Sequence, residues 1–157
     1  MSAIGSTDDS LVGLRGLMLS LRRVIEEQTG LVCSSHIIDH TGNTAASMMN
    51  DTFSLELQTA NAEQYREDVA LRLRHALGVT LCWKLNPSDA FESQQACLAV
   101  EEQVIRALSE RIATAEVRVV FENTARTLSA HREYLLSRLT FRVEHDWYSQ
   151  PLSSAYA

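Results

Sequence analysis

The sequence predicts an α+β domain in which an antiparallel β-sheet with long hairpins packs against two amphipathic helices. Three observations lead to this fold class. In the last third of the chain apolar residues alternate with other residues, as in Val117, Val119 and Phe121, which is the period of a strand with one buried face. A second alternating run follows a short polar segment, so the two strands are expected to pair as antiparallel neighbours. Two other stretches carry apolar residues at the three- and four-residue spacing of helices.

The composition is that of an ordinary globular protein. Apolar residues make up 45% of the 157 residues and charged residues 22%, which favours one domain with its own core over a disordered chain. The formal charge is −6, and Lys84 is the single lysine. This balance argues against a protein that is held on nucleic acid by neutralising phosphates.

Neither a targeting segment nor a metal framework is evident. Met1–Ser10 lacks the basic and apolar regions of a signal peptide, and no stretch approaches the length of an apolar membrane span. A soluble protein made in a cytosol is therefore expected. Cys33, Cys82 and Cys97 have no metal-ligand spacing and are interpreted as reduced, partly buried thiols.

The first helix is predicted to begin after Asp8 and Asp9 and to end at Gly30. The two acids lie at the positive end of the helix dipole, and glycine is the residue that most often follows a helix. The apolar stripe between these ends is spaced by three and four residues and consists of Leu11, Leu14, Met18, Leu21 and Ile25.

The central segments are interpreted as strands and a loop. A short strand is expected within 31–38, a long mobile loop over 41–51, and a half-buried strand around Phe53. Segment 62–77 is open to two interpretations, strand or helix. We favour a long strand over 69–85, because the odd-numbered apolar series continues to its end and is broken only by His75.

The second helix is predicted over 89–112, after Asn86 and Pro87 break the long strand. Asp89 is placed to cap it. Apolar residues recur every seven positions, and further apolar residues fill the stripe between them. The opposite face carries charged residues and is expected to be exposed to solvent, a wet face. The stripe contains Phe91, Cys97, Leu98, Val104, Ile105, Leu108 and Ile112, and the wet face contains Glu101, Glu102, Arg106, Glu110 and Arg111.

The chain closes with the hairpin. Its connection is predicted as a polar loop over Asn123–His131 that is too long for a simple turn. The resulting organisation is a flexible N-terminus over 1–9, one α+β domain over 10–148 and a flexible C-terminal tail over 149–157. Strand residues including Phe53, Leu81, Val119 and Phe141 are expected to share one buried sheet face beneath the second helix.

Few residues suggest catalysis or metal binding. His36, Asp39 and His40 resemble a ligand set, but on a strand the two imidazoles would be about 13 Å apart, too far for one metal. His145 lies on the opposite strand face from its acidic neighbours, Glu144 and Asp146, so these three cannot form a proton relay within one strand.

Other candidate nucleophiles lack the setting that catalysis requires. Cys82 and Cys97 have no helix start and basic neighbour to activate them, and Ser129 and Ser137 lie outside a nucleophile elbow. We therefore expect no catalytic residue, no metal site and no cofactor.

Three segments resemble one family of virion proteins. They are KLNPSD at 84–89, RTLS at 126–129 and REYLLSRLTFRVEHDW at 132–147. Together with the order of the expected elements over about 11–147, they resemble the tail terminator, or tail-completion, proteins of long-tailed bacteriophages, which join the tail to the head. That family consists of small acidic α+β proteins that assemble as rings at the top of the tail tube.

The resemblance implies a structural role in the virion, at the neck of the tail, for a protein made in the host cytoplasm. The partners it implies are further copies in a ring, expected to be a hexamer, the tail tube protein and the head-tail connector or neck protein. DNA would pass through the ring without specific binding, and no membrane is involved. The residues expected at subunit or tube interfaces are Arg72, Arg74, Lys84, Arg126, His131 and Arg132.

Other interpretations remain open at the level of the sequence. A different neck or connector adaptor, or a tube-like protein that polymerises into stacks, would share the same pattern. A small α+β enzyme or ligand-binding domain is a further alternative, as is a nonviral adaptor. The state of assembly distinguishes these classes, since a closed ring favours the terminator and a monomer with a ligand pocket favours the enzyme.

Overall fold

The computed structural model describes residues 14–43, 48–65, 70–111 and 117–148. Both predicted flexible ends, 1–9 and 149–157, lie outside these ranges, as do Asp8, Asp9, Leu11 and Ile112. The elements of the described part are α1 (Leu14–Thr29), β1 (Val32–Cys33), β2 (Thr52–Tyr65), β3 (Ala70–Lys84), α2 (Ala90–Arg111), β4 (Val117–Leu128) and β5 (Tyr134–Tyr148).

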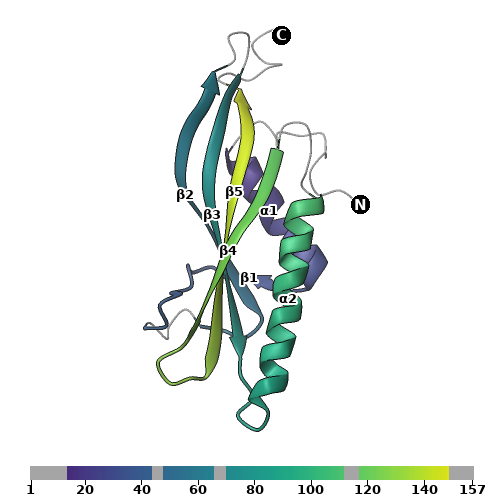
Figure 1. Ribbon diagram of the computed structural model, residues 1–157, viewed down its shortest axis with the longest axis vertical. Helices are drawn as coiled ribbons and strands as arrows, with labels where there is room; N and C mark the ends of the chain where they lie inside the picture. Colours follow the sequence, from purple (N-terminus) through teal and green to yellow (C-terminus); the bar gives the residue numbers. More distant parts are fainter. Residues whose placement is uncertain (1–13, 44–47, 66–69, 112–116, 149–157) are drawn as a thin grey trace.

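The strands form one twisted sheet in the order β1-β2-β3-β5-β4 (Figure 1). β1 pairs with β2 in parallel, and the other neighbours are antiparallel. β3 and β5 form the centre, paired without a register shift from Ala70 opposite Tyr148 to Lys84 opposite Tyr134. The predicted α+β class with an antiparallel sheet and long hairpins is confirmed.

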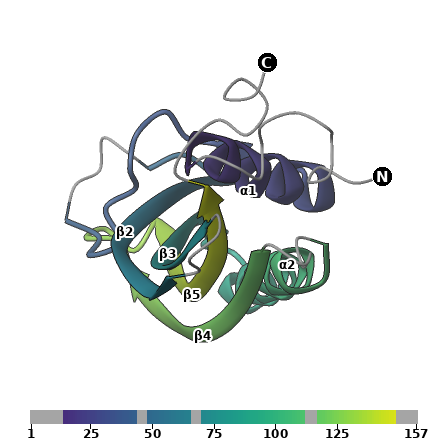
Figure 2. The ribbon, with the colours of Figure 1, turned by 90° about the horizontal axis from the view of Figure 1, so that it is seen from above.

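Both helices cover the same face of the sheet (Figure 2). Gly30 ends α1 with a φ of 75°, the left-handed conformation in which glycine is tolerated best, and its N–H donates to the carbonyl of Glu26. The core that the helices and sheet enclose consists of Leu17, Leu21, Val24, Ile25, Leu31, Phe53, Leu77, Val79, Leu81, Val104, Ala107, Leu108, Val117, Val119, Leu139, Phe141 and Val143. The predicted buried face is therefore confirmed.

The strand interpretation of 62–77 is correct for the residues that the structure describes in that segment. β3 is a central strand with hydrogen-bonded neighbours on both sides, which favours an apolar face running its whole length. His75, the residue that broke the odd-numbered series, lies on this face and is buried. It forms a hydrogen bond with His145, Nε2 to Nδ1, at 3.3 Å.

The second helix begins as predicted, since Asp89 accepts the N–H of Glu92 at 3.0 Å. Two of its residues differ from the prediction. Phe91, placed in the buried stripe, lies in the first turn of α2 and is 71% exposed. Glu101, placed on the wet face, is 2% exposed, because it shares the core-facing side with Cys97, Val104 and Leu108.

The predicted loop over Asn123–His131 is wrong, because β4 continues to Leu128 and leaves only the turn 129–133. A register shift between Phe121 and Asn123 reverses which residues face the helices. This shift interrupts the alternation from which the strand was predicted. β4 is also the last strand of the sheet, so its end carries exposed polar side chains.

The short strand expected within 31–38 is β1, which consists of the two residues Val32 and Cys33. After Cys33 the chain crosses to the sheet face that the helices leave uncovered. There Ile38 and Met48 form a second, small apolar cluster with Cys82 and Leu136. This explains why Cys82 and Leu136 are buried although they lie on the face opposite the main core.

The sheet has two long edges whose outer sides are unpaired within the described residues. β1 pairs with β2 only at Thr52 and Phe53, which leaves the rest of β2 as an edge. β4 is the edge on the opposite side along its whole length. None of the described helices is long and apolar enough to cross a membrane.

Candidate functional site

A cavity of about 820 Å³ lies at the end of the molecule that carries the β3–α2 and β4–β5 turns, the lower end in Figure 1. One wall is the turn from Lys84 to Pro87 with the start of α2, and the other is the hairpin of β4 and β5. Its lining includes Leu85, Ala90, Gln94, Leu98, Arg126, Leu128, His131, Arg132, Glu133 and Leu135. We call it the end cavity.

Hydrogen bonds from polar side chains fix the α2 wall of the end cavity. Asn86 donates its N–H to Ser93 Oγ at 2.8 Å and accepts the N–H of Ser88 at 2.9 Å through Oδ1. Asp89 then caps the helix. The NPSD sequence thus makes a tight reversal that ends β3 and starts α2 within a few residues.

The hairpin wall is fixed by Ser129, whose Oγ accepts the N–H groups of Glu133 at 3.1 Å and Tyr134 at 3.0 Å. Arg132 has a φ of 58°, a conformation that non-glycine residues seldom adopt. The backbone carbonyl of Gly42, from the segment that follows β1, also stabilises the turn by accepting the N–H of Ala130 at 3.0 Å. A Cβ at Gly42 would lie 2.8 Å from the carbonyl oxygen of Leu128, so only glycine fits there.

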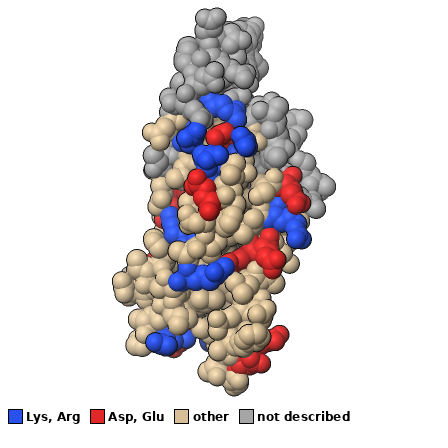
Figure 3. Space-filling model, in the orientation of Figure 1, with Lys and Arg blue, Asp and Glu red and all other residues tan. Residues whose placement is uncertain are grey.

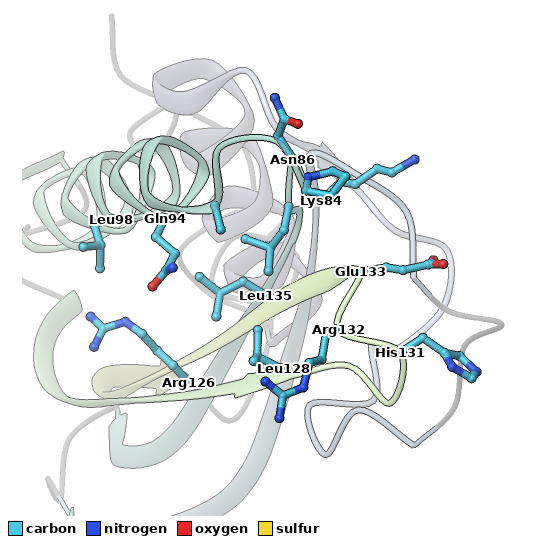
Figure 4. Close-up of a pocket in the computed structure, with 13 residues that line it drawn as sticks. Lys84, Asn86, Gln94, Leu98, Arg126, Leu128, His131, Arg132, Glu133 and Leu135 are labelled. Atoms are coloured by element: carbon cyan, nitrogen blue, oxygen red, sulfur yellow. The ribbon is translucent and has the colours of Figure 1, made fainter.

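The interior of the end cavity is mostly apolar and its surroundings are basic. In Figure 4 Gln94, Leu98, Leu128 and Leu135 point toward the space between α2 and the hairpin, whereas Lys84, His131 and Glu133 point away from its centre. This arrangement suits an apolar group that enters between the walls with negative charge near the opening.

A buried polar cluster joins the two walls beside the cavity. The carboxylate of Glu101 accepts hydrogen bonds from Arg126 Nε at 3.0 Å and Nη2 at 2.6 Å, and from the hydroxyl of Ser137. The hydrogen bond to Glu101 raises the pKa of Arg126. Cys97 Sγ lies 3.7 Å from Ser137 Oγ. We call these four residues the Glu101 cluster.

The structure brings four of the six predicted interface residues together. Lys84, Arg126, His131 and Arg132 all line the end cavity. The other two, Arg72 and Arg74, lie toward the opposite end of β3, where they surround Glu144 with Arg142. On that upper part of the outer face, basic and acidic side chains intermix (Figure 3). The prediction that these six residues make interfaces stays a prediction.

The candidates for chemistry are held in ordinary structural contacts. Asp39 accepts the N–H of Thr41 at 3.0 Å, and His36 and His40 are exposed. Within the described residues, no group of three possible ligands could hold a metal. His145 is buried and lies against His75. Burial lowers the pKa of His75 and raises the pKa of Cys82 and Cys97 to about 11.

Glu101 and Leu98 are the site residues whose roles the sequence analysis missed or left incomplete. Glu101 falls at the spacing of the buried stripe, four residues after Cys97 and three before Val104. This spacing indicated a buried position, but Glu101 was assigned to the exposed face because charged side chains are seldom buried. Leu98 was assigned to the core, but it also forms part of the cavity wall.

Comparison with known proteins gives little beyond the structure itself. No protein-family model matches the chain, and no curated protein matches it. Among solved structures the chain is similar to one in the virion of a native gene transfer agent (GTA) particle. That match has 12% identity, covers 80% of this chain and 84% of the other, and has a TM-score of 0.40.

Proposed function

We propose that this chain is a structural virion protein that forms a closed ring, a hexamer, at the junction of a phage-like head and tail. In this role it caps the tail tube and joins it to the head connector. The segments KLNPSD, RTLS and REYLLSRLTFRVEHDW motivate the proposal through their resemblance to tail terminators. They fall on the β3–α2 turn, the end of β4 and the central strand β5.

The observation that carries the proposal is the pair of open edges on one sheet. The edges of β2 and β4 lie on opposite sides of the sheet. Long open edges invite uncontrolled strand addition, and soluble proteins cover or close them. Two different edges on one subunit are suited to a head-to-tail contact, and such a contact gives a ring when the rotation closes.

The charge of the chain is compatible with DNA passing through such a ring. With a formal charge of −6, the chain repels phosphate on average. A passage that DNA must traverse benefits from weak binding. The proposal therefore includes no specific DNA contact.

The first test is the mass of the purified protein in solution by size-exclusion chromatography with light scattering. A hexamer gives six times the 17.5 kDa of one chain. A monomer at all accessible concentrations contradicts the ring. Open-ended stacks favour a tube-like protein instead of a terminator.

Edge variants then test how the ring closes. Ala125 and Thr127 are exposed on β4, so Ala125→Lys with Thr127→Lys places two charges on the edge strand. Ala99→Lys with Gln103→Lys, at exposed positions of α2, is the control with the same added charge. The edge pair is expected to give folded monomers and the control to keep the ring. Rings that survive both changes contradict closure through β4.

The biological test is to image, by negative stain, particles that were assembled without the protein. Without a terminator no chemical reaction is lost, but the tail is neither capped nor joined to the head. Filled heads should therefore lie separate from tails that are overlong or unstable at their upper end. Normal joined particles would exclude a terminator.

A further inference from the structure

The end cavity combines an apolar interior with exposed apolar surface next to it. Leu98, Leu128 and Leu135 line the interior, and Leu128 is 40% exposed. Phe91 lies seven residues before Leu98 on α2, which places the two on nearly the same side of the helix, and it is highly exposed. Large apolar side chains left open beside an apolar cavity are typical of surfaces that bind another molecule.

The charge around the end cavity is opposite to that of the chain. Three lining residues carry a positive charge, Lys84, Arg126 and Arg132, against one acid, Glu133, in a chain with a formal charge of −6. Within the described part of the chain, neither Lys84 nor Arg132 forms an ion pair. Arg126 is bound to Glu101 but keeps a side chain that is 46% exposed. This local excess of positive charge is complementary to carboxylates.

The free edge of β4 runs along the same cavity. Arg126 and Leu128 belong both to this edge strand and to the cavity lining. An extended segment that approaches here can form main-chain hydrogen bonds with β4 while alternate side chains point between β4 and α2. A small molecule would leave that edge unused, so the geometry favours a peptide.

We propose that the end cavity docks an extended segment of a different protein that carries a large apolar side chain between carboxylates. The apolar side chain enters between Leu98, Leu128 and Leu135. The carboxylates lie near Arg126 and Arg132, with Lys84 adding charge at the outer rim. The docked segment and the ring contact both use the edge of β4, so the segment binds a subunit whose β4 edge is not paired with a neighbour. Binding to a single subunit does not require ring formation.

The test measures binding of a short fluorescent peptide with a central leucine flanked by aspartates, by fluorescence anisotropy at low salt. Two matched peptides replace the leucine by serine or the aspartates by lysines. Saturable binding of the first peptide with a Kd on the order of 100 μM is expected. Both replacements should abolish it. No saturable binding up to about 1 mM would overturn the proposal.

Protein variants locate the binding. Lys84→Gln with Arg132→Asn removes two rim charges, and asparagine tolerates the positive φ at position 132 better than most residues. This pair should weaken peptide binding about three- to tenfold. Leu128→Ser should weaken it as well. The control pair Arg106→Gln with Arg118→Gln removes two exposed charges elsewhere and should leave the Kd unchanged.

Each alternative has its own signature. Equal loss of binding in the control pair would mean that the peptide responds only to net charge. Unchanged binding after Leu128→Ser would exclude the apolar cavity. Loss of self-association in Leu128→Ser, whose substituted side chain lines the cavity, would identify a second copy as the occupant and overturn the proposal of a different partner. Light scattering on Lys84→Gln with Arg132→Asn separates this site from the ring, which that pair should retain.

Discussion

Two buried glutamates, Glu101 and Glu144, occupy opposite faces of the sheet and bind arginine in different ways. Glu101 lies on the helix face and binds one arginine through two short hydrogen bonds. Glu144 lies on the outer face, with Arg142, Arg74 and Arg72 at 3.1, 3.7 and 3.8 Å. The first arrangement is a specific bidentate pair, and the second is a looser group of charges.

The difference lies in what each glutamate connects. Arg72, Arg74 and Arg142 lie on β3 and β5, the same two adjacent strands whose backbones already hold Glu144 in place. The Glu101 cluster instead links α2 to β4 and β5, elements with no shared backbone ladder. A polar contact between separate elements fixes their relative position, so the Glu101 cluster also sets the width of the end cavity beside it.

The largest effect is expected for Arg126→Ala, which leaves the carboxylate of Glu101 buried without its charged partner. We expect a loss of about 2 to 3 kcal/mol in the free energy of unfolding. This loss is smaller than the roughly 3 to 5 kcal/mol for a fully buried pair because Arg126 is half-exposed. Urea denaturation measures it. Adding Glu101→Gln should restore part of the loss, and an unrestored double variant would contradict the pairing as the cause.

A smaller effect is expected for Glu144→Gln, which keeps the shape and removes the charge that three arginines share. We expect a loss of about 1 to 1.5 kcal/mol, since water partly screens these arginines. High salt should reduce the difference from the wild type, because it weakens repulsion among the remaining cations. A loss as large as that of Arg126→Ala would show that the ion pairs of the two glutamates contribute equally to the free energy of unfolding.

The sequence predicted the fold and most of its elements because apolar periodicity survives wherever one face is buried. It failed where that periodicity ends. Beyond Phe121 a register shift and an open edge remove the alternation, so the end of β4 resembled a loop. Glu101 was misplaced because a carboxylate is buried only when a distant partner, Arg126, meets it, and spacing along one helix carries no information about that partner.

The candidate site was predictable in part for the same reason. Lys84 ends β3 and Arg132 lies in the β4–β5 turn, and both are exposed, so local sequence was enough to predict that their side chains face solvent. Their common position around one cavity could not. It depends on the backbone contact of Leu85 N–H with the carbonyl of Glu133, which joins turns far apart in the chain.

The buried pair of His75 and His145 adds a polar contact without a required charge. Burial lowers the pKa of His75, so the unfolded chain takes up its proton first as the pH falls through about 6.5. Stability that is present above that pH is therefore lost on acidification. Between pH 7 and pH 5 we expect the free energy of unfolding of His75→Gln to fall less than that of the wild type, measured by denaturation at each pH. Parallel pH profiles would contradict a titrating His75.

The smallest effect is expected in the reactivity of two cysteine thiols that lie on opposite faces of the sheet. Burial raises the pKa of both Cys82 and Cys97 to about 11, so only about one thiol in a thousand is ionised at pH 8. Both should react with a thiol reagent far more slowly than unfolded protein, as followed by peptide mass spectrometry.

Arg126→Ala should accelerate the reaction of Cys97, which lies in the Glu101 cluster, and leave Cys82 unchanged on the other face. Arg126 lowers the pKa of Cys97, so its removal alone would slow the reaction, and any acceleration must come from α2 opening away from the sheet. Equal acceleration of both thiols would indicate global unfolding instead. An unchanged Cys97 would mean that the Glu101 cluster does not hold α2 against the hairpin.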